Sequence, residues 1–360
     1  QKSHLHADLH ATTLAAEALP DGVLTLNELL EVQWCNAAAA QHLGLNIATD
    51  RHHAITNILR APEFLTYAQQ PEAWEAPLLL HSSQPSRPQA LLVQLIAYGQ
   101  AQTLMVTRDM SQMERLETTR KDFVANVSHE LRTPLTVLIG FLETLSDPAA
   151  AHLAPEQRRH YEQLMREQAH HMQAIVEDLL TLSSLESSRS NDGLIVHATK
   201  VIRAVLQQAQ LLSNEQHSWQ IELEEDVNLI GTEQELASAF ANLLTNAVRY
   251  TPAGGTIQVR WARSPNGGAQ FAVQDTGIGI APQDVPRLTE RFYRADKGRA
   301  RATGGTGLGL AITRHVVLRH QAELMIQSRL GEGSCFHINF PAQVVRPQPT
   351  SANHPSTETI

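Results

Sequence analysis

The stretch VSHELRTPLTVLIGF, residues 127–141, joins an apolar helical repeat to four residues that a packing helix does not need: His129, Glu130, Thr133 and Pro134. His129 lies two residues from the nearest apolar positions of the repeat, which turns it about 200° away from them at about 100° per residue. It therefore projects towards solvent. A histidine that only fills a core would face the other way, so the spacing favours a reactive histidine.

The neighbours of His129 add chemistry to this helix face. Thr133 follows four residues later and stands one turn along on the same face. Glu130 lies about 100° round the helix, close enough to take a proton from an imidazole nitrogen. Pro134 cannot donate to the carbonyl of Glu130, and a proline inside a helix costs roughly 3 kcal/mol. We therefore expect the helix to bend here for a functional reason.

The apolar repeat continues on both sides of this stretch and then occurs a second time. Between the two repeats, Pro148 and Pro155 in SDPAAAHLAP predict a break. Two long amphipathic helices over residues 110–190 would form a hairpin, which alone cannot bury both apolar stripes. We therefore expect a homodimer whose hairpins pair as a four-helix bundle. The stripes are Phe123, Val127, Leu131, Leu135, Leu138, Leu142 and Leu145, then Tyr161, Leu164, Met172, Ile175, Leu179, Leu182 and Leu185.

Composition narrows the possible functions. The 360 residues, 42% of them apolar, are enough for two or three domains. A net charge of −9 and a pI near 6.0 argue against direct nucleic-acid binding, which needs a basic surface. The two cysteines, Cys35 and Cys335, support neither a disulfide framework nor a zinc site. The chain has 18 histidines, and we interpret six that lack cysteine or carboxylate partners at metal-ligand spacing as solvated surface residues: His4, His6, His10, His152, His170 and His171.

The two ends of the sequence suggest a longer protein and a loose tail. The chain opens with Gln1, its first methionine is Met105, and no apolar run reaches the roughly 18 residues that span a bilayer. We expect the cytoplasmic portion of an inner-membrane protein whose membrane anchor is absent from this chain. Residues 343–360 are rich in proline, serine and threonine, without apolar periodicity, which predicts a disordered tail.

The first 109 residues have a mixed α/β pattern. Short apolar runs over residues 22–35 predict a hairpin, and Asn36 is placed to cap a short helix that Gly44 ends. ALLVQLIAYG and QTLMVTRDM then predict two adjacent strands. This order of elements resembles a PAS sensor domain, although many other α+β domains would fit it.

Three motifs in the last part of the chain suggest nucleotide binding, although no GxxxxGK[ST] loop occurs. NLLTNAVRYTP begins at Asn242 and places Asn246 one turn later, where an amide oxygen suits Mg²⁺. In DTGIGI, Asp275 can accept a hydrogen bond from an adenine amino group, while Gly277 and Gly279 let the backbone approach the ring.

The third motif, GGTGLGLAI, leads into a helix, where glycines and exposed amides suit triphosphate oxygens. Its glycines at 305, 307 and 309 do not match the dinucleotide fingerprint GxGxxG. Each motif alone can be explained without a bound nucleotide, because asparagine in a helix is usually a surface residue and Asp-Thr-Gly is usually a turn. Their order and spacing together favour a nucleotide site.

These stretches together resemble the sensor histidine kinases of two-component systems. FVANVSHELRTPLTVLIGF resembles the phospho-acceptor box of that family. The resemblance implies that His129 is the phosphorylated nucleophile and Glu130 the general base. It also implies that Thr133 positions water when a partner is dephosphorylated.

The three nucleotide motifs resemble the N, G1 and G2 boxes of the family, and RFYRADKG resembles its F box. This implies an α/β-sandwich (Bergerat-type) domain over residues 194–342 that binds ATP and Mg²⁺ under a mobile lid, with Asn246 as the Mg²⁺ ligand. Of the lid cations, Arg294 and Lys297 would contact phosphate, and a solvated basic loop is the alternative. The other implied contacts are Asn242, Arg249, Tyr250, Asp275, Gly277, Gly279, Gly305, Thr306, Gly307, Leu308 and Gly309.

The resemblance covers about residues 110–342 and implies an enzyme that phosphorylates its own histidine from ATP. The phosphoryl group would pass to an aspartate in the receiver domain of a response regulator, and the same protein would also dephosphorylate it. The linker MVTRDMSQMERLE and the PAS-like segment are most similar to sensor kinases of phosphate regulons. That similarity implies phosphate-starvation signalling with a phosphate-transporter-associated regulator as a further partner.

Two other functions remain open at this stage. The chain could be a sensory scaffold in which phosphatase action through Thr133 dominates, or an ATPase of the same sandwich fold without phosphotransfer, such as a chaperone relative. His129 next to Glu130 on a dimer-type hairpin speaks against the ATPase. The stimulus, any PAS ligand, and transfer within or between protomers are not determined by the pattern.

Overall fold

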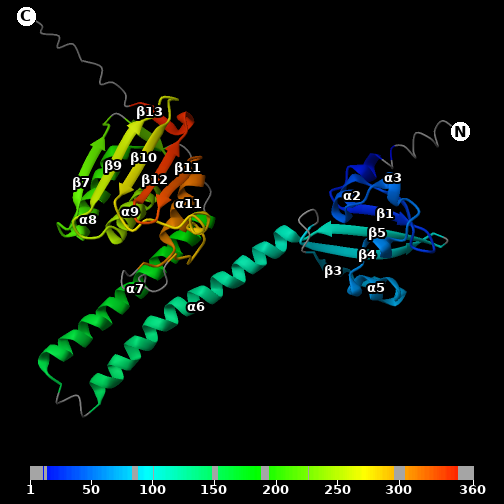
Figure 1. Cartoon of the computed structure of the whole chain (residues 1–360), viewed down its shortest axis with the longest axis horizontal. Helices are drawn as coiled ribbons and strands as arrows, with labels where there is room; N and C mark the ends of the chain where they lie inside the picture. Colours follow the sequence, from blue (N-terminus) through cyan, green and yellow to red (C-terminus); the bar gives the residue numbers. More distant parts are fainter. Residues whose placement is uncertain are drawn as a thin grey trace, which may run out of the picture. The chain divides into compact units, whose positions relative to one another are not determined.

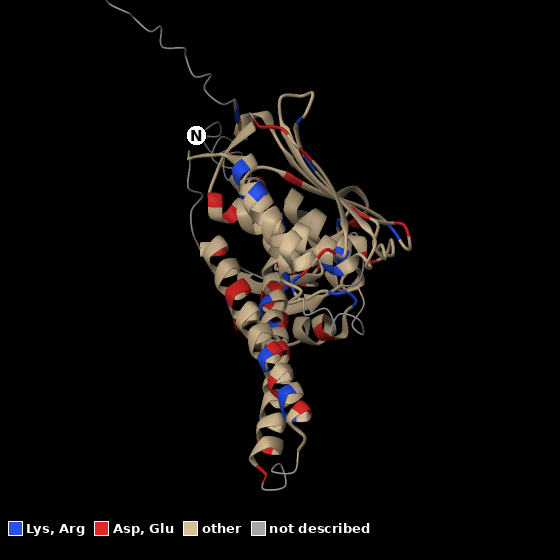
Figure 2. Cartoon of the chain, turned by 90° about the vertical axis from the view of Figure 1, so that its left-hand side faces the viewer, with Lys and Arg blue, Asp and Glu red and all other residues tan. Residues whose placement is uncertain are grey.

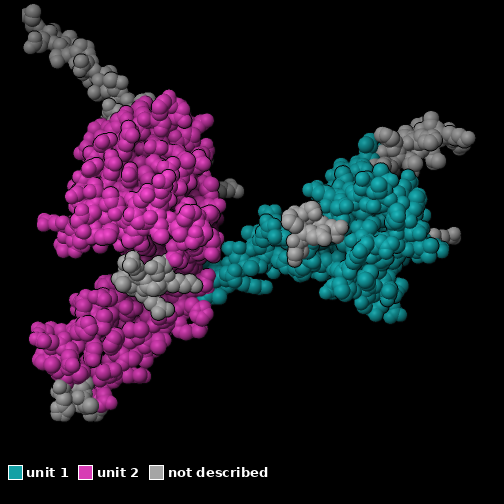
Figure 3. Space-filling view, in the orientation of Figure 1, with its two compact units in different colours: residues 1–125 teal, residues 126–360 magenta. Residues whose placement is uncertain are grey.

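The computed structural model describes residues 11, 14–82, 88–99, 101–147, 153–187, 194–225, 227–295 and 305–347. The chain divides into two compact units, Gln1–Ala125 and Asn126–Ile360 (Figures 1 and 3). Within the described ranges, no helix combines the length and the apolar character that a membrane span requires.

The first unit is built on a five-stranded antiparallel sheet with the order β2-β1-β5-β4-β3. Its core, which includes Leu24, Phe64 and Met105, is fully buried. The hairpin and the two adjacent strands that the sequence predicts are confirmed. The elements are β1 Gly22–Leu26, β2 Val32–Cys35, α2 Ala37–Leu43, α3 Ile47–Asp50, α4 Ile55–Ile58, α5 Pro62–Ala68, η1 Pro71–Glu75, β3 Leu78–His81, β4 Ala90–Tyr98 and β5 Gln102–Asp109.

The predicted helix start at Asn36 is also confirmed. The Asn36 side chain is fully buried, and its amide oxygen accepts hydrogen bonds from the backbone N–H of Ala39 (2.9 Å) and of Val23 (3.0 Å). Its amide nitrogen donates to the carbonyls of Ala16 and Asp21. All four hydrogen-bonding positions are satisfied, so the residue caps α2 and ties it to β1.

Two long helices follow, α6 Ser111–Ser146 and α7 Pro155–Ser187. They pair as a hairpin, with Phe141 stacked on Tyr161 at 5.2 Å between ring centroids. Acidic and basic residues are interspersed along the two helices of the hairpin (Figure 2), as on a solvated helix face. α6 runs through Pro134 as one helix, without an interruption.

The apolar stripes of the hairpin are only partly covered within one chain. Ile175, Leu182 and Leu185 of α7 are buried, whereas Leu135 and Leu142 of α6 are 46% and 54% exposed. Part of the predicted packing surface therefore faces outward in a single chain.

The remainder of the second unit is a two-layer α/β domain (Figure 1). A five-stranded sheet has the order β11-β12-β10-β9-β7, with β7 parallel to β9 and the other pairs antiparallel. Phe240 of α9 packs on Trp261, Phe271 and Phe340 of this sheet. The elements are β6 Ile195–Val196, α8 Ala198–Ser213, β7 Ser218–Leu223, β8 Val227–Ile230, α9 Glu233–Tyr250, β9 Thr256–Arg263, β10 Ala269–Asp275, η3 Val285–Arg287, α11 Gly309–Arg319, β11 Glu323–Arg329, β12 Gly333–Phe340, η4 Ala342–Val344 and β13 Val345–Pro347.

The predicted start of a disordered tail at residue 343 is wrong. η4 and β13 continue the domain to Pro347, and β13 pairs with β8 in a three-stranded sheet, β13-β8-β6. Val344 and Val345 are 8% and 6% exposed. These two apolar residues lie in a stretch of mostly polar residues, so the composition of that stretch does not indicate that they are buried. The rest of the predicted tail, residues 348–360, lies outside the described residues.

Ending the chain after Pro341 should therefore destabilise the α/β domain, whereas ending it after Pro347 should not. Burial of a valine side chain contributes about 1.5–3 kcal/mol, so losing two should lower the melting temperature by about 5 °C or more. Differential scanning calorimetry of the two truncated chains measures this, and equal melting temperatures would contradict the role of β13.

Candidate nucleotide pocket and phospho-acceptor helix

A cavity of about 410 Å³ lies where the C-terminal part of α9, the end of β10 and the loop before α11 meet. It gathers most of the residues that the sequence assigns to a nucleotide site. Gly277 and Leu308 do not line it, and Lys297 falls outside the described residues. The predicted residues that line the cavity are Asn242, Asn246, Arg249, Tyr250, Asp275, Gly279, Arg294, Gly305, Thr306, Gly307 and Gly309.

Asp275 ends β10 with its carboxylate buried in the cavity wall. One oxygen accepts a hydrogen bond from the backbone N–H of Gly277 at 2.8 Å. Burial raises the pKa of Asp275, and hydrogen bonds from the backbone of Gly277 and Ser334 oppose the rise. A side chain at Gly277 would place Cβ 2.4 Å from the carbonyl oxygen of Tyr250, so only glycine fits there. Gly277 thus shapes the wall that holds Asp275.

Hydrogen bonds from Phe292 and from Asn242 of α9 fix the loop before α11. Gly307 adopts φ +74°, and its carbonyl accepts a hydrogen bond from the N–H of Phe292 at 2.9 Å. The Asn242 side chain donates to the carbonyl of Gly309 at 3.0 Å. The side chain of Leu308, in the same loop, is fully buried. Asn242 therefore links α9 to the start of α11, and its role in supporting a nucleotide site remains a prediction.

Two cations flank this loop. The nearest guanidinium nitrogens of Arg249 and Arg294 lie 3.5 and 3.6 Å from the point where Gly305 would carry a Cβ. Burial and the neighbouring charge of Arg294 both lower the pKa of Arg249. Two like charges brought together beside exposed loop amides form an environment that an anion stabilises.

Asn246 lies on the same wall, one turn after Asn242. Its amide oxygen is a hard donor of the kind that Mg²⁺ accepts, and no hydrogen-bond partner for this side chain is found in the described part of the chain. Mg²⁺ keeps several waters and phosphate oxygens as ligands, so a single protein ligand is compatible with it.

Two residues of the cavity come from the helical hairpin and were missed in the sequence. Ala174 and Asp178 of α7 line it, and Thr306 donates a hydrogen bond to the carboxylate of Asp178 at 2.5 Å. A signal was present, because an acidic residue stands between Ile175 and Leu182 in the apolar repeat. Periodicity alone does not tell which partner such a residue meets.

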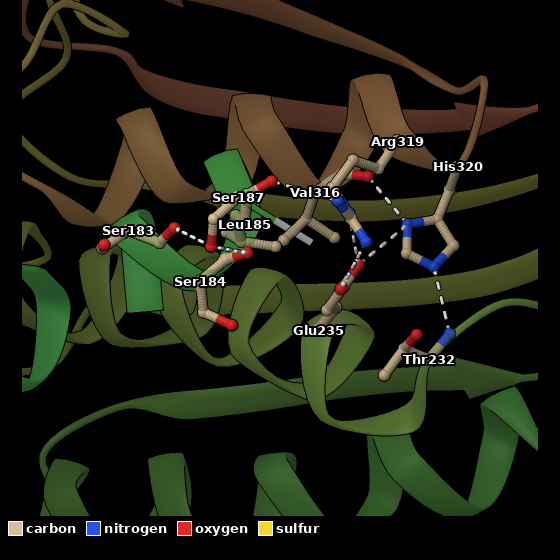
Figure 4. Close-up of polar contacts among 9 residues, drawn as sticks. All are labelled: Ser183, Ser184, Leu185, Ser187, Thr232, Glu235, Val316, Arg319 and His320. Atoms are coloured by element: carbon tan, nitrogen blue, oxygen red, sulfur yellow. Dashed lines mark hydrogen bonds and ion pairs between the residues drawn. The ribbon is translucent and has the colours of Figure 1, made fainter. Parts of the chain in front are cut away.

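A polar network fixes the end of α7 on the α/β domain (Figure 4). Arg319 donates to the carbonyl of Leu185 at 3.0 Å and pairs through two nitrogens with Glu235, at 3.1 Å each. Its neighbour His320 donates from Nδ1 to the carbonyl of Val316 and accepts from the N–H of Thr232 at Nε2. His320 thereby caps the start of α9, a position where the Thr232 side chain makes no capping bond.

The cavity lies level with the phospho-acceptor stretch along the hairpin. Both helices rise about 1.5 Å per residue, and Phe141 stacks on Tyr161. Thirteen residues before Phe141, α6 reaches Ser128, and thirteen residues after Tyr161, α7 reaches Ala174. Ala174 therefore lies at the same level along the hairpin as Ser128, the residue next to His129. His129 is exposed, as its helical position predicts.

The other two predicted residues of this face are also on α6. Glu130 is half-buried beside His129. Thr133 is exposed, and its hydroxyl donates to the carbonyl of His129 at 3.2 Å, one turn before it. Glu130 and Thr133 therefore lie near His129, while their catalytic roles remain predictions.

Comparisons with known proteins agree with this architecture. Three family descriptions match: "PAS domain" at residues 12–77, "His Kinase A (phospho-acceptor) domain" at 119–188, and "Histidine kinase-, DNA gyrase B-, and HSP90-like ATPase" at 231–344. The phosphate regulon sensor protein PhoR of Pseudomonas aeruginosa is 43% identical over 346 residues, covering 95% of this chain and 77% of that protein. The chain belongs to the sensor histidine kinases. It is an ATP-dependent histidine kinase of the PhoR-like type.

Further relatives extend the same pattern. The PhoR protein of Haemophilus influenzae is 32% identical over 327 residues, covering 91% of this kinase and 75% of that protein. The crystal structure of the histidine kinase ThkA in complex with the response regulator protein TrrA covers 89% of this kinase and 95% of that chain. At a TM-score of 0.50 and 18% identity, this likeness shows the fold. The α+β organisation expected from the sequence is confirmed.

Asp275→Asn should weaken binding of ATP about ten- to a hundredfold, because the hydrogen bond to a charged acceptor contributes roughly 1.5–3 kcal/mol. The loss should be specific for adenine, so a GTP analogue should bind as it does to the wild type. Isothermal titration calorimetry with both nucleotides measures this. Glu222→Gln, an exposed change on β7, is the control. Unchanged ATP affinity in Asp275→Asn would refute the adenine role.

Proposed function

We propose that this kinase phosphorylates its own His129 from ATP and passes the phosphoryl group to an aspartate in the receiver domain of a response regulator. The observation that carries the proposal is the position of the cavity. It is lined by the candidate ATP residues and by Ala174 of α7, which comes level with the residue next to His129. A nucleotide held there would lie against α7, at the level of His129 along the hairpin.

The first step is a displacement at the γ-phosphorus of ATP. An imidazole nitrogen of His129 attacks that phosphorus, the bond to the β,γ-bridging oxygen breaks, and ADP leaves. Glu130 takes the proton from the other ring nitrogen, so the imidazole ring of the phosphohistidine is left uncharged. Arg249 and Arg294 offset the charge on the phosphates. Asn246 would hold Mg²⁺, which when bound neutralises phosphate oxygens and orients them.

The exposed apolar residues of α6 support a homodimer. Leu135 and Leu142 lie in the helical repeat yet face outward in a single chain. Pairing two hairpins as a four-helix bundle would cover them. The receiver domain of a response regulator would then meet the same helix surface, where His129 is exposed.

The signalling context is inferred from the relatives. Two of them are phosphate regulon sensor proteins and match over most of this kinase, which supports a role in phosphate-starvation signalling. On this reading the PAS unit receives its input from a phosphate-transporter-associated regulator. The kinase would work on the cytoplasmic side of the inner membrane, where ATP is available, as the cytoplasmic portion of a membrane protein.

His129→Ala should abolish labelling by γ-labelled ATP and leave nucleotide affinity unchanged, because His129 does not line the cavity. The label on the wild type should be acid-labile and base-stable, as a phosphoramidate is. His170→Ala, another histidine of the hairpin, serves as the control and should label normally. Wild-type labelling of His129→Ala would refute the assignment of the nucleophile.

Thr133→Ala separates the two activities proposed for this helix face. Autophosphorylation needs the His129 nitrogen, a base and ATP, but no hydroxyl one turn away. Hydrolysis of a partner's aspartyl phosphate needs a water held in line, and on this proposal the Thr133 hydroxyl holds it.

The variant should therefore keep autophosphorylation and phosphotransfer and lose most phosphatase activity. Decay of a phosphorylated response regulator in the presence of ADP measures this. Thr136→Ala, the next threonine of α6, is the matched control because its hydroxyl also donates one turn back, to Arg132. Equal decay with wild type and Thr133→Ala would remove Thr133 from the mechanism.

A further inference from the structure

Asp178 reaches the nucleotide cavity from the helical hairpin, outside the domain that supplies the rest of the site. It stands on α7 between the buried residues Ile175 and Leu182, so the docked helix directs it at the loop of residues 305–309. Its carboxylate accepts the hydroxyl hydrogen of Thr306 at 2.5 Å. The same hydroxyl oxygen accepts from the N–H of Leu308 at 3.2 Å.

The surroundings of this carboxylate are those of a bound phosphate. Thr306 supplies a hydroxyl donor, and the first turn of α11, which begins at Gly309, supplies the positive end of a helix. Burial raises the pKa of Asp178 above its ordinary value, and the hydrogen bond from Thr306 and the positive charge of Arg249 oppose the rise. A side-chain anion thus occupies the Thr306 hydroxyl, a donor that a phosphate oxygen would use.

A nucleotide phosphate and the Asp178 carboxylate cannot both occupy the place beside the Thr306 hydroxyl at low cost. Both are negative, and like charges a few ångströms apart in a partly buried site repel strongly. One anion must leave when the other arrives. Because Asp178 belongs to α7 and the loop belongs to the α/β domain, its departure breaks a contact between the hairpin and that domain.

We propose that Asp178 competes with nucleotide phosphate for the loop of residues 305–309, so that ATP binding and the contact of α7 with this loop exclude each other. The proposal rests on the nucleotide site proposed above and adds a regulatory role for a residue outside it. The hairpin then governs the affinity for ATP, and ATP in turn weakens the hold of the hairpin on the domain.

The number of phosphates in the ligand tests the proposal. In the full 360-residue chain, Asp178→Asn keeps the size of the side chain and removes its charge. Its affinity for Mg²⁺ with a non-hydrolysable ATP analogue should rise on the order of tenfold. Its affinity for adenosine, which has no phosphate, should stay as in the wild type. A general structural change would alter both affinities.

The matched control is Glu177→Gln, the adjacent acidic residue, which is exposed and hydrogen-bonded to Gln173. It should change neither affinity. Asp178→Ala, with its melting temperature recorded, provides a second variant that should also bind the analogue more tightly. Unchanged or weaker binding of the analogue to Asp178→Asn, or an equal gain for adenosine, would overturn the competition.

Asn246→Ala distinguishes a failure of the proposed competition from a failure of the proposed nucleotide site. If Asn246→Ala loses Mg²⁺-dependent binding while Asp178→Asn binds like the wild type, the site stands and the competition is wrong. If Asn246→Ala also binds like the wild type, the proposed nucleotide site is wrong.

Discussion

The side chain of Arg319 links the α/β domain to the end of the hairpin, because it pairs with Glu235 of α9 and also contacts α7. Both side chains are nearly buried, at 15% and 16% exposed, and Arg319 also donates to the carbonyl of Leu185. The last carbonyls of a helix have no partner within the helix and carry partial negative charge, so a guanidinium there is favourable. With Leu182 and Leu185 buried, this contact fixes the end of α7.

The rest of the site follows from that attachment. With its end fixed, the rigid helix α7 presents Asp178 and Ala174, two and three turns earlier, to the nucleotide cavity. The pairing of α6 with α7 then brings His129 to the same level. The chain carries a net charge of −9, yet its cavity concentrates Arg249 and Arg294 beside loop amides. Local arrangement, not net charge, makes the site suitable for a triphosphate.

Local signals were sufficient for much of this fold. The apolar repeat predicts both long helices, Asn36 predicts a helix start, and alternating runs predict the strands of the first unit, because each depends on neighbours in sequence. The motifs around Asn246, Asp275 and Gly307 likewise predicted residues that the structure gathers in one cavity.

The features that were missed depend on contacts between distant segments. Asp178 finds Thr306 across 128 positions, and β13 pairs with β8 more than a hundred residues earlier. No periodicity reports such a partner. For Asn242, the sequence motif predicted that the residue belongs to the site. Only the structure shows that its side chain donates a hydrogen bond to the carbonyl of Gly309.

We propose that the cavity delivers the γ-phosphoryl group of ATP to one histidine of the hairpin. His170 and His171 of α7 lie near the same level as His129, so position alone does not single it out. Tandem mass spectrometry of the wild-type chain after incubation with ATP and Mg²⁺, kept at neutral to basic pH to preserve phosphohistidine, makes the distinction. We predict that the phosphoryl group is found on His129, beside Glu130. Phosphate on His170 or His171, with His129 unmodified, would contradict it.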